Sequence, residues 1–187
     1  MKLMIASDIH GSAYYCRKLL EAYKTEKAER LLLLGDILYH GPRNDLPKDY
    51  APKEVIAMLN AMKNEILCVR GNCDTEVDQM VLEFPILADY AVIINGKRDI
   101  YATHGHIYNE NNLPPIKDGD ILLCGHTHVP KITEHRGGEK EPRYTYINPG
   151  SVSIPKEESH HGYIILEDDE MKWKDLLGKV IDNYLLW

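Results

Sequence analysis

The sequence lacks the features that place a chain in a membrane or in an oxidising compartment. No apolar run approaches the length that crosses a bilayer, and the apolar opening is interrupted at Asp8, too early for the apolar region of a signal peptide. Four cysteines are spread along the chain without CxxC spacing. We interpret them as free thiols in a reducing compartment. The expectation is a cytoplasmic protein with no membrane-bound part.

Positive charge is also scarce. The chain has 22 Lys and Arg against 29 Asp and Glu, a formal net charge of -7. Because affinity for nucleic acid depends on neutralising phosphates with Lys and Arg, we expect no binding of long nucleic acid. The 187 residues are enough to bury a core without disulfides, and we predict a single domain over residues 1–187.

The first half of the chain alternates between strand and helix patterns. Apolar runs at residues 2–7, 31–34 and 66–69 are typical of buried strands, each followed by polar residues. Helical spacing at residues 12–27 and 52–63 separates them. This alternation predicts a parallel α/β sheet.

From about residue 86 the pattern becomes strand-rich. Residues 91–95 and 99–103 form a predicted hairpin around Gly96-Lys97, and strands are expected at 121–124, 131–134, 143–147 and 163–166. We expect antiparallel pairing here, two packed sheets and helices outside. The tail at 172–187 has no resolved pattern, and its aromatic residues Tyr184 and Trp187 could pack on a partner.

Three predicted strands of the first half end in polar residues suited to metal binding. Asp8 and His10 follow the first strand, Asp36 follows the second and Asn72 follows the third. Carboxylate, amide and imidazole groups bind divalent cations, and one carboxylate can bridge two of them. Each motif taken alone is equally typical of a turn or a helix cap. Their combination favours a metal site.

Two later segments supply a cluster of histidines. His104 and His106 follow one apolar strand, and His126 and His128 follow another. Histidine is the commonest metal ligand. Gly105 and Gly125 beside these residues would allow a positive φ or a close backbone approach, although packing of a small residue is the competing explanation.

In this order the motifs resemble the calcineurin-like metallophosphoesterase superfamily. They resemble more closely the small bacterial and archaeal phosphodiesterases of the YfcE type. The segments that carry the resemblance are SDIHG at 7–11, GDILYHGPRN at 35–44, RGNCD at 70–74, THGH at 103–106, GHTH at 125–128 and NPGSVSIPK at 148–156.

The resemblance implies a four-layer α/β/β/α sandwich of two mixed sheets flanked by helices. It also implies two divalent ions: one bound by Asp8, His10 and His128, the other by Asn72, His104 and His126, with Asp36 as the bridge. Manganese is the metal usually associated with such enzymes. Zinc, iron, nickel and magnesium remain alternatives, because oxygen and nitrogen ligands accept them all.

The expected activity is hydrolysis of a small phosphodiester by a metal-bridging hydroxide that attacks phosphorus in line. Many relatives carry His after the Gly-Asn motif, where it is the expected proton donor to the leaving group, but this chain has Cys73. His106 is an alternative donor or an orienting residue. Asn72 and Arg43 are candidate contacts to substrate, although a plain structured loop accounts equally well for Arg43.

Two other functions remain open from the sequence. A phosphomonoesterase would use the same metals. A non-catalytic protein-binding scaffold of the same fold is less favoured, because the small subunit of retromer, which has this fold, departs at the bridging acid and the Gly-Asn motif, whereas Asp36 and Asn72 are intact here. The subfamily resemblance and the aromatic tail also suggest a homo-oligomer.

Overall fold

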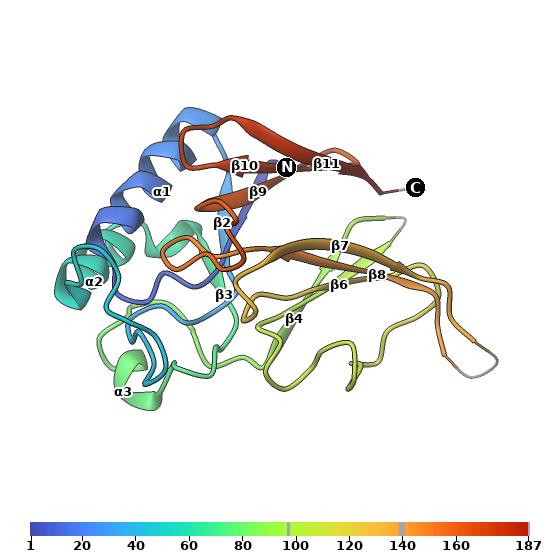
Figure 1. The fold of residues 1–187 in the computed structure, drawn as a ribbon, viewed down its shortest axis with the longest axis horizontal. Coiled ribbons are helices and arrows are strands. Elements are labelled where there is room, and N and C mark those ends of the chain that lie inside the picture. Colours follow the sequence, from blue (N-terminus) through green and yellow to red (C-terminus); the bar gives the residue numbers. More distant parts are fainter. Residues whose placement is uncertain (97, 139–140, 187) are drawn as a thin grey trace.

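The computed structural model describes residues 1–96, 98–138 and 141–186. Two mixed β-sheets pack face to face, with the labelled helices beside the first sheet (Figure 1). The first sheet has the order β11–β10–β9–β1–β2–β3, with bounds β1 Leu3–Ala6, β2 Arg30–Leu33, β3 Ile66–Cys68, β9 Gly162–Glu167, β10 Glu170–Asp175 and β11 Val180–Leu185. The second has the order β4–β5–β6–β8–β7, with bounds β4 Tyr90–Ile94, β5 Asp99–Thr103, β6 Ile121–Leu123, β7 Pro130–His135 and β8 Tyr144–Pro149.

The helices α1 (Ala13–Glu26) and α2 (Pro52–Asn60) cover the outer face of the first sheet, and α3 (Glu76–Gln79) and a 3₁₀ turn (Lys63–Glu65) are short. Helix α1 begins because the Ser12 side chain accepts a hydrogen bond from the Tyr15 N–H, and it ends at Lys27 in the left-handed conformation. The helix buries Cys16 and Leu19 toward the sheet. Burial of one such leucine contributes about 1.5–3 kcal/mol.

Strand β1 is apolar throughout because both of its faces are buried. Met4 and Ala6 face the helices, whereas Leu3 and Ile5 face the second sheet. It pairs in parallel with β2, which pairs in parallel with β3, as the alternation of strands and helices predicts. The ends of these three strands therefore meet at one edge.

The two mixed sheets and flanking helices confirm the predicted fold class, but the outer layer of the second sheet differs in detail. Residues 105–120 cover that face as a loop, with Leu113 and Ile116 packed on Tyr101 and Tyr144. Pro114-Pro115 interrupts helical hydrogen bonding in this segment.

The expectation of antiparallel pairing in the second half holds only in part. The predicted hairpin β4–β5 and the pair β7–β8 are antiparallel, as are the pairings of β9 with β1 and β10 and of β10 with β11. It is wrong for β5, β6 and β8, which pair in parallel. The tail, for which the sequence shows no clear pattern, forms β10 and β11, which extend the first sheet. Lys97 of the predicted turn and Trp187 lie outside the described residues.

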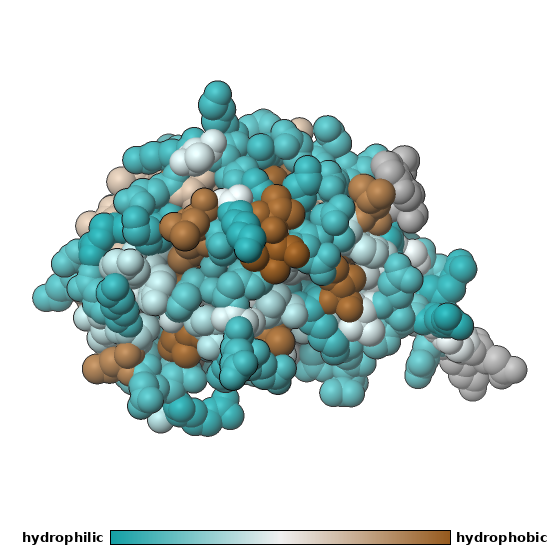
Figure 2. Space-filling view, turned by 45° about the horizontal axis from the view of Figure 1, so that its top comes forward, coloured by the Kyte–Doolittle hydropathy of each residue, from teal (hydrophilic) through white to brown (hydrophobic). Residues whose placement is uncertain are grey.

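Hydrophobic side chains reach the surface in small groups on the face that Figure 2 shows, separated by hydrophilic ones. Among the described residues no helix combines the length and the apolar character that a membrane crossing needs.

Candidate metal centre

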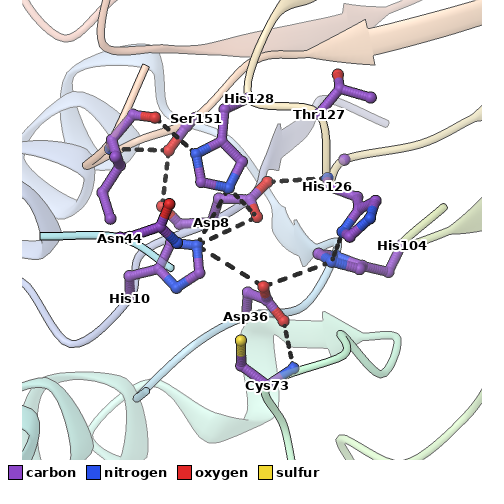
Figure 3. Close-up of polar contacts among 12 residues, drawn as sticks. Asp8, His10, Asp36, Asn44, Cys73, His104, His126, Thr127, His128 and Ser151 are labelled. Carbon is purple, nitrogen blue, oxygen red and sulfur yellow. Dashed lines mark hydrogen bonds and ion pairs between the residues drawn. The ribbon is translucent and has the colours of Figure 1, made fainter. Parts of the chain in front are cut away.

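All seven predicted ligands lie together at one edge of the two sheets. Asp8 and His10 follow β1, Asp36 follows β2, and Asn72 follows β3, whereas the three histidines follow β5 and β6 of the second sheet. Because the strands within each set run in parallel, their carboxyl ends converge. Figure 3 shows Asp36 between a group formed by Asp8, His10 and His128 and a group formed by His104 and His126.

The first group consists of Asp8, His10 and His128, and one side-chain atom of each lies within 3.5 Å of the other two. The distance from Asp8 Oδ1 to His128 Nε2 is 3.2 Å, and that to His10 Nε2 is 3.5 Å. The two imidazole Nε2 atoms are 3.2 Å apart. Ligand atoms on a single divalent ion are separated by distances of this order, because each bond is about 2.0–2.2 Å long.

The second group consists of Asn72, His104 and His126. The Nε2 atom of His104 lies 3.1 Å from Asn72 Oδ1 and 3.2 Å from His126 Nδ1. Asp36 Oδ2 faces both groups, at 3.5 Å from His104 Nε2 and 3.7 Å from His10 Nε2. This single carboxylate oxygen therefore lies within 4 Å of a histidine of each group.

Backbone carbonyl groups orient three of the histidines. Nδ1 of His10 lies 2.7 Å from the Tyr39 carbonyl, and Nδ1 of His104 and of His128 lies 2.6 Å from the carbonyls of Leu34 and Ile154. A carbonyl can only accept, so each Nδ1 carries the hydrogen. In the neutral ring each Nε2 therefore presents its lone pair to the centre.

This arrangement fits divalent cations. The lone pairs of His10 and His128 converge on Asp8 Oδ1, a buried oxygen that accepts no hydrogen bond among the described residues. Several acceptors that face one another in a buried site repel unless a cation lies between them. The mixed oxygen and nitrogen donor set suits manganese, iron and zinc.

The pKa values of the acidic and imidazole groups are shifted by their neighbours in the centre. Burial opposes the charged form of Asp8, but the neighbouring imidazoles of His10, His128 and His104 outweigh it and hold the pKa of Asp8 well below its usual value. Burial would likewise lower the pKa of His10, yet Asp8 and Asp36 raise it. The pKa of His126 is lowered by burial and by His104. The carboxylates of Asp8 and Asp36 thus favour positive charge on the neighbouring His10.

Five of the seven predicted ligands have a left-handed backbone, which residues other than glycine rarely adopt. The φ angles are 62° at Asp8, 50° at His10, 55° at Asp36, 67° at His126 and 63° at His128. Such conformations cost of order 1–3 kcal/mol each and persist where the surroundings enforce them. They turn the chain sharply at each strand end, so that consecutive ligand side chains reach the centre.

Glycines make the close backbone packing of these loops possible. A Cβ on Gly35 would lie 2.3 Å from the Gly71 nitrogen, and one on Gly71 would lie 2.1 Å from Asp36 Oδ1. A Cβ on Gly125 would lie 2.0 Å from the Ser7 Oγ atom, and Gly105 has a φ of 111°. Gly105 thus has the positive φ that was one of its expected roles. Gly125 has no positive φ, and its contact with Ser7 fits the alternative, close packing of a small residue.

We expect Gly71→Ala to displace Asp36 from the centre, because the new methyl group overlaps its carboxylate. The free energy of unfolding should fall by about 1–3 kcal/mol, the range for overpacking. Chemical denaturation and the metal content of the purified protein measure the two effects. Gly138→Ala is the matched control, since its Cβ would meet nothing within 4 Å; equal behaviour of the two variants would contradict the steric explanation.

Sequence reasoning missed Asp74, whose carboxylate joins two of the ligand loops. It accepts hydrogen bonds from the backbone N–H groups of Asp36 at 2.8 Å, Ile37 at 2.9 Å and Gly71 at 2.7 Å. Burial raises its pKa to about 6. Asp74 follows Asn72 by two residues in the RGNCD segment. The sequence pattern does not show that this acid is buried, so it was not predicted.

Side chains of the segment 148–153 donate hydrogen bonds to the backbone of the loops that carry Asp8 and His126. The Asn148 amide donates to the Gly125 carbonyl at 2.7 Å, and the hydroxyls of Ser151 and Ser153 each donate to the Asp8 carbonyl at 3.0 Å. These bonds fix the two strand ends that carry Asp8 and His126. His160 and His161 are not part of the centre; His161 stacks on Tyr15.

A cleft of about 390 Å³ opens over the centre. Arg43 and Asn72, the two predicted substrate contacts, both line it. Thr127 and Lys156 also line it, and sequence reasoning assigned them no role. Both belong to segments that carry the family resemblance, which was the available signal.

The two candidate proton donors differ in position. Cys73 lines the cleft, whereas His106 is absent from its described lining and lies beside His104, with the ring centroids 5.4 Å apart. Burial, His104 and His126 lower the pKa of His106 to about 4, and its buried Nδ1 atom has no hydrogen-bond partner among the described residues. At neutral pH this ring is uncharged.

Comparison with known proteins agrees with this geometry. The model of the calcineurin-like phosphoesterase superfamily domain matches residues 1–171. The chain is 46% identical to phosphodiesterase YfcE of Escherichia coli K12 over 169 residues, which cover 90% of this chain and 89% of that one. It is 24% identical to the probable metallophosphoesterase YsnB of Bacillus subtilis, over 98% of this chain and 96% of that protein. The solved structure of the Escherichia coli phosphoesterase Yfce superposes with a TM-score of 0.91 at 43% identity, covering all of both chains.

Proposed function

This chain belongs to the calcineurin-like phosphoesterase superfamily, and from that premise we propose that it is a metal-dependent phosphodiesterase that hydrolyses a small phosphodiester at a dinuclear centre. The name of the Escherichia coli relative supports the diester class. The proposal of two metal ions rests on the position of Asp36 Oδ2, which lies near His10 on one side and His104 on the other.

The residues of this chain divide into two ligand sets and a bridge. Asp8, His10 and His128 would hold one ion, and Asn72, His104 and His126 the other, with Asp36 shared between them. When bound, such ions supply a water of lowered pKa as the nucleophile and neutralise charge on the phosphoryl oxygens. The backbone hydrogen bonds to the histidines keep the ligands in place during turnover.

The neutral amide of Asn72 suits a site that binds an anion. It contributes an oxygen ligand without adding negative charge where the phosphodiester enters, and its side chain borders the cleft. The cleft volume of about 390 Å³ supports a small substrate rather than a polymer.

Manganese is the metal that we propose, with zinc, iron, nickel and magnesium as alternatives. Metal-free protein reconstituted separately with Mn, Zn, Mg and Ni and assayed on aryl monoesters and diesters tests the metal and the ester class together. We expect the highest rate on diesters with Mn. A clear preference for monoesters would overturn the diester assignment in favour of a phosphomonoesterase.

The non-catalytic scaffold is the weaker alternative, because the bridging Asp36 and the Gly-Asn motif are both present. If metal removal left partner binding as the protein's sole measurable activity, the scaffold would be favoured instead.

His106→Ala tests the proton donor. If the protonated form of the His106 ring, which is the minor form at neutral pH, donates its proton to the leaving group, this variant should lose most activity on diesters with poor leaving groups, by roughly 10²-fold. Diesters of 4-nitrophenol, which leaves without a proton, should be affected least. Rates measured across leaving groups of graded pKa give the comparison, and equal losses on all of them would leave His106 with an orienting role only.

We also propose that the protein is cytoplasmic and forms homo-oligomers. All four cysteines are buried and unpaired, which supports a reducing compartment. Sedimentation analysis of the purified chain tests the oligomer, and a monomer at micromolar concentration would contradict it.

A further inference from the structure

Two cationic side chains that line the cleft, Arg43 and Lys156, have no ion-pair or hydrogen-bond partner for their charged groups among the described residues. For an arginine this is unusual in the described part of the chain. Nearly every other arginine bonds to a carboxylate, a carbonyl or a hydroxyl: Arg17, Arg30, Arg70, Arg98 and Arg143. The protein is acidic overall, yet it leaves these two cations unpaired beside the centre.

A strained turn holds the backbone of Lys156 against the centre. The Lys156 N–H donates to the carbonyl of His128 at 3.2 Å, and the Ser159 N–H donates back to the Lys156 carbonyl at 3.0 Å. Between them Glu157 and Glu158 have φ angles of 53° and 57°. Two consecutive left-handed residues other than glycine are costly. The turn therefore anchors Lys156 directly to a ligand residue.

The loop that carries Arg43 is anchored on the other side of the cleft lining. The Asn44 side chain donates to the His40 carbonyl at 2.8 Å and closes a tight loop around Arg43. Gly41 has a φ of 80° and lies against Cys73, so that a Cβ added there would be 3.3 Å from its Sγ atom. Both cations thus project from fixed backbone.

The charge in the cleft exceeds what a simple phosphodiester neutralises. Such an ester has one negative charge, which the positive centre itself balances. Asp36 is the one carboxylate in the described lining, and it belongs to the centre. Arg43 and Lys156 then have no counter-charge from either the protein or the reacting phosphate.

We infer that the preferred substrate is a phosphodiester whose retained arm carries a second phosphate group, which Arg43 and Lys156 bind. The inference rests on the proposed function and adds the substrate class to it. Arginine matches phosphate oxygens with a two-pronged donor, and lysine adds a mobile point charge. No Phe, Tyr or Trp is among the described lining residues, so base stacking does not account for recognition of that arm.

A pair of chromogenic substrates isolates the second phosphate. Thymidine 5′-(4-nitrophenyl phosphate) and its 3′-phosphorylated form have the same reacting group and leaving group. In each, water adds to the 5′ phosphorus and its bond to 4-nitrophenolate breaks. Both cations are exposed, and an exposed ion pair contributes up to about fivefold in affinity. We therefore expect kcat/KM to be about tenfold higher for the 3′-phosphorylated substrate, with the gain in KM.

The variants Arg43→Gln, Lys156→Gln and the double variant should lower this ratio stepwise toward one. Because the readout is a ratio between two substrates within each variant, a general loss of activity cancels. Arg136→Gln and Lys179→Gln are matched controls, since the charged groups of both residues lack a partner in the described part of the chain and neither residue lines the cleft. The controls should keep the wild-type ratio.

Calorimetric binding of thymidine 3′,5′-bisphosphate and of thymidine 5′-phosphate to the metal-loaded protein gives a readout independent of turnover. Tighter binding of the bisphosphate, lost in the double variant, supports the inference. Equal binding, or a substrate ratio that survives in the double variant, overturns it. If neither nitrophenyl ester is hydrolysed, the proposed function fails, and the calorimetric difference alone decides whether the two cations bind a phosphate group.

Discussion

Asp36→Asn should lower metal-dependent phosphodiester hydrolysis by at least about a thousandfold in kcat/KM. The carboxylate oxygen that faces both histidine groups becomes one end of a neutral amide, and charge stabilisation by a metal contributes several kcal/mol, with each 1.4 kcal/mol a factor of ten. The amide also weakens the acceptor for the Cys73 N–H, which now donates to Asp36 Oδ1 at 2.8 Å. Steady-state rates and the number of ions per chain measure the loss.

Asp45→Asn is the matched control for this change. Asp45 is an exposed acid in the same loop and lies outside the described lining of the cleft. It should retain full activity and full metal content. A folded Asp36→Asn protein that kept full metal-dependent turnover would contradict the bridging role.

Cys73→His should raise hydrolysis of diesters with poor leaving groups by roughly 10²-fold, the contribution typical of a positioned general acid. Burial, with Asp36 next in effect, raises the pKa of the Cys73 thiol far above neutral, so the native side chain does not release its proton readily. Cys73 lines the cleft, where an imidazole would reach the leaving group. Rates on alkyl and 4-nitrophenyl diesters of one series give the comparison.

Cys73→Ala separates proton donation from changes in cleft shape. It should change the 4-nitrophenyl rate little and should not gain activity on alkyl esters. If Cys73→His slowed both ester classes alike, Cys73 would be a packing residue, and the missing donor would have to be sought elsewhere.

The ends of the first three strands were predictable because apolar runs followed by Asp8, Asp36 and Asn72 leave little choice about where buried strands stop. In a parallel sheet such ends are neighbours, so the convergence of ligands from the first sheet follows from the pattern. The approach of the histidines of the second sheet does not follow in this way. It was expected from the family resemblance.

Other parts could not be predicted from local pattern. Strand β11 is exposed on both faces over most of its length, so its sequence shows no alternation. The loop over residues 105–120 replaces a helix that only the four-layer expectation required. Asp74 and the left-handed ligands depend on how distant loops pack, which spacing along the chain does not report.

The seven side chains that we propose as metal ligands come from the ends of strands in two different sheets: four from the first and three from the second. Ions bound among them would link the first sheet to the second. Such a link obeys mass action: at a free ion concentration of 100 times Kd, each site adds about 2.7 kcal/mol to the folded state. Starvation for metal would then shorten the lifetime of the fold itself, in addition to stopping catalysis.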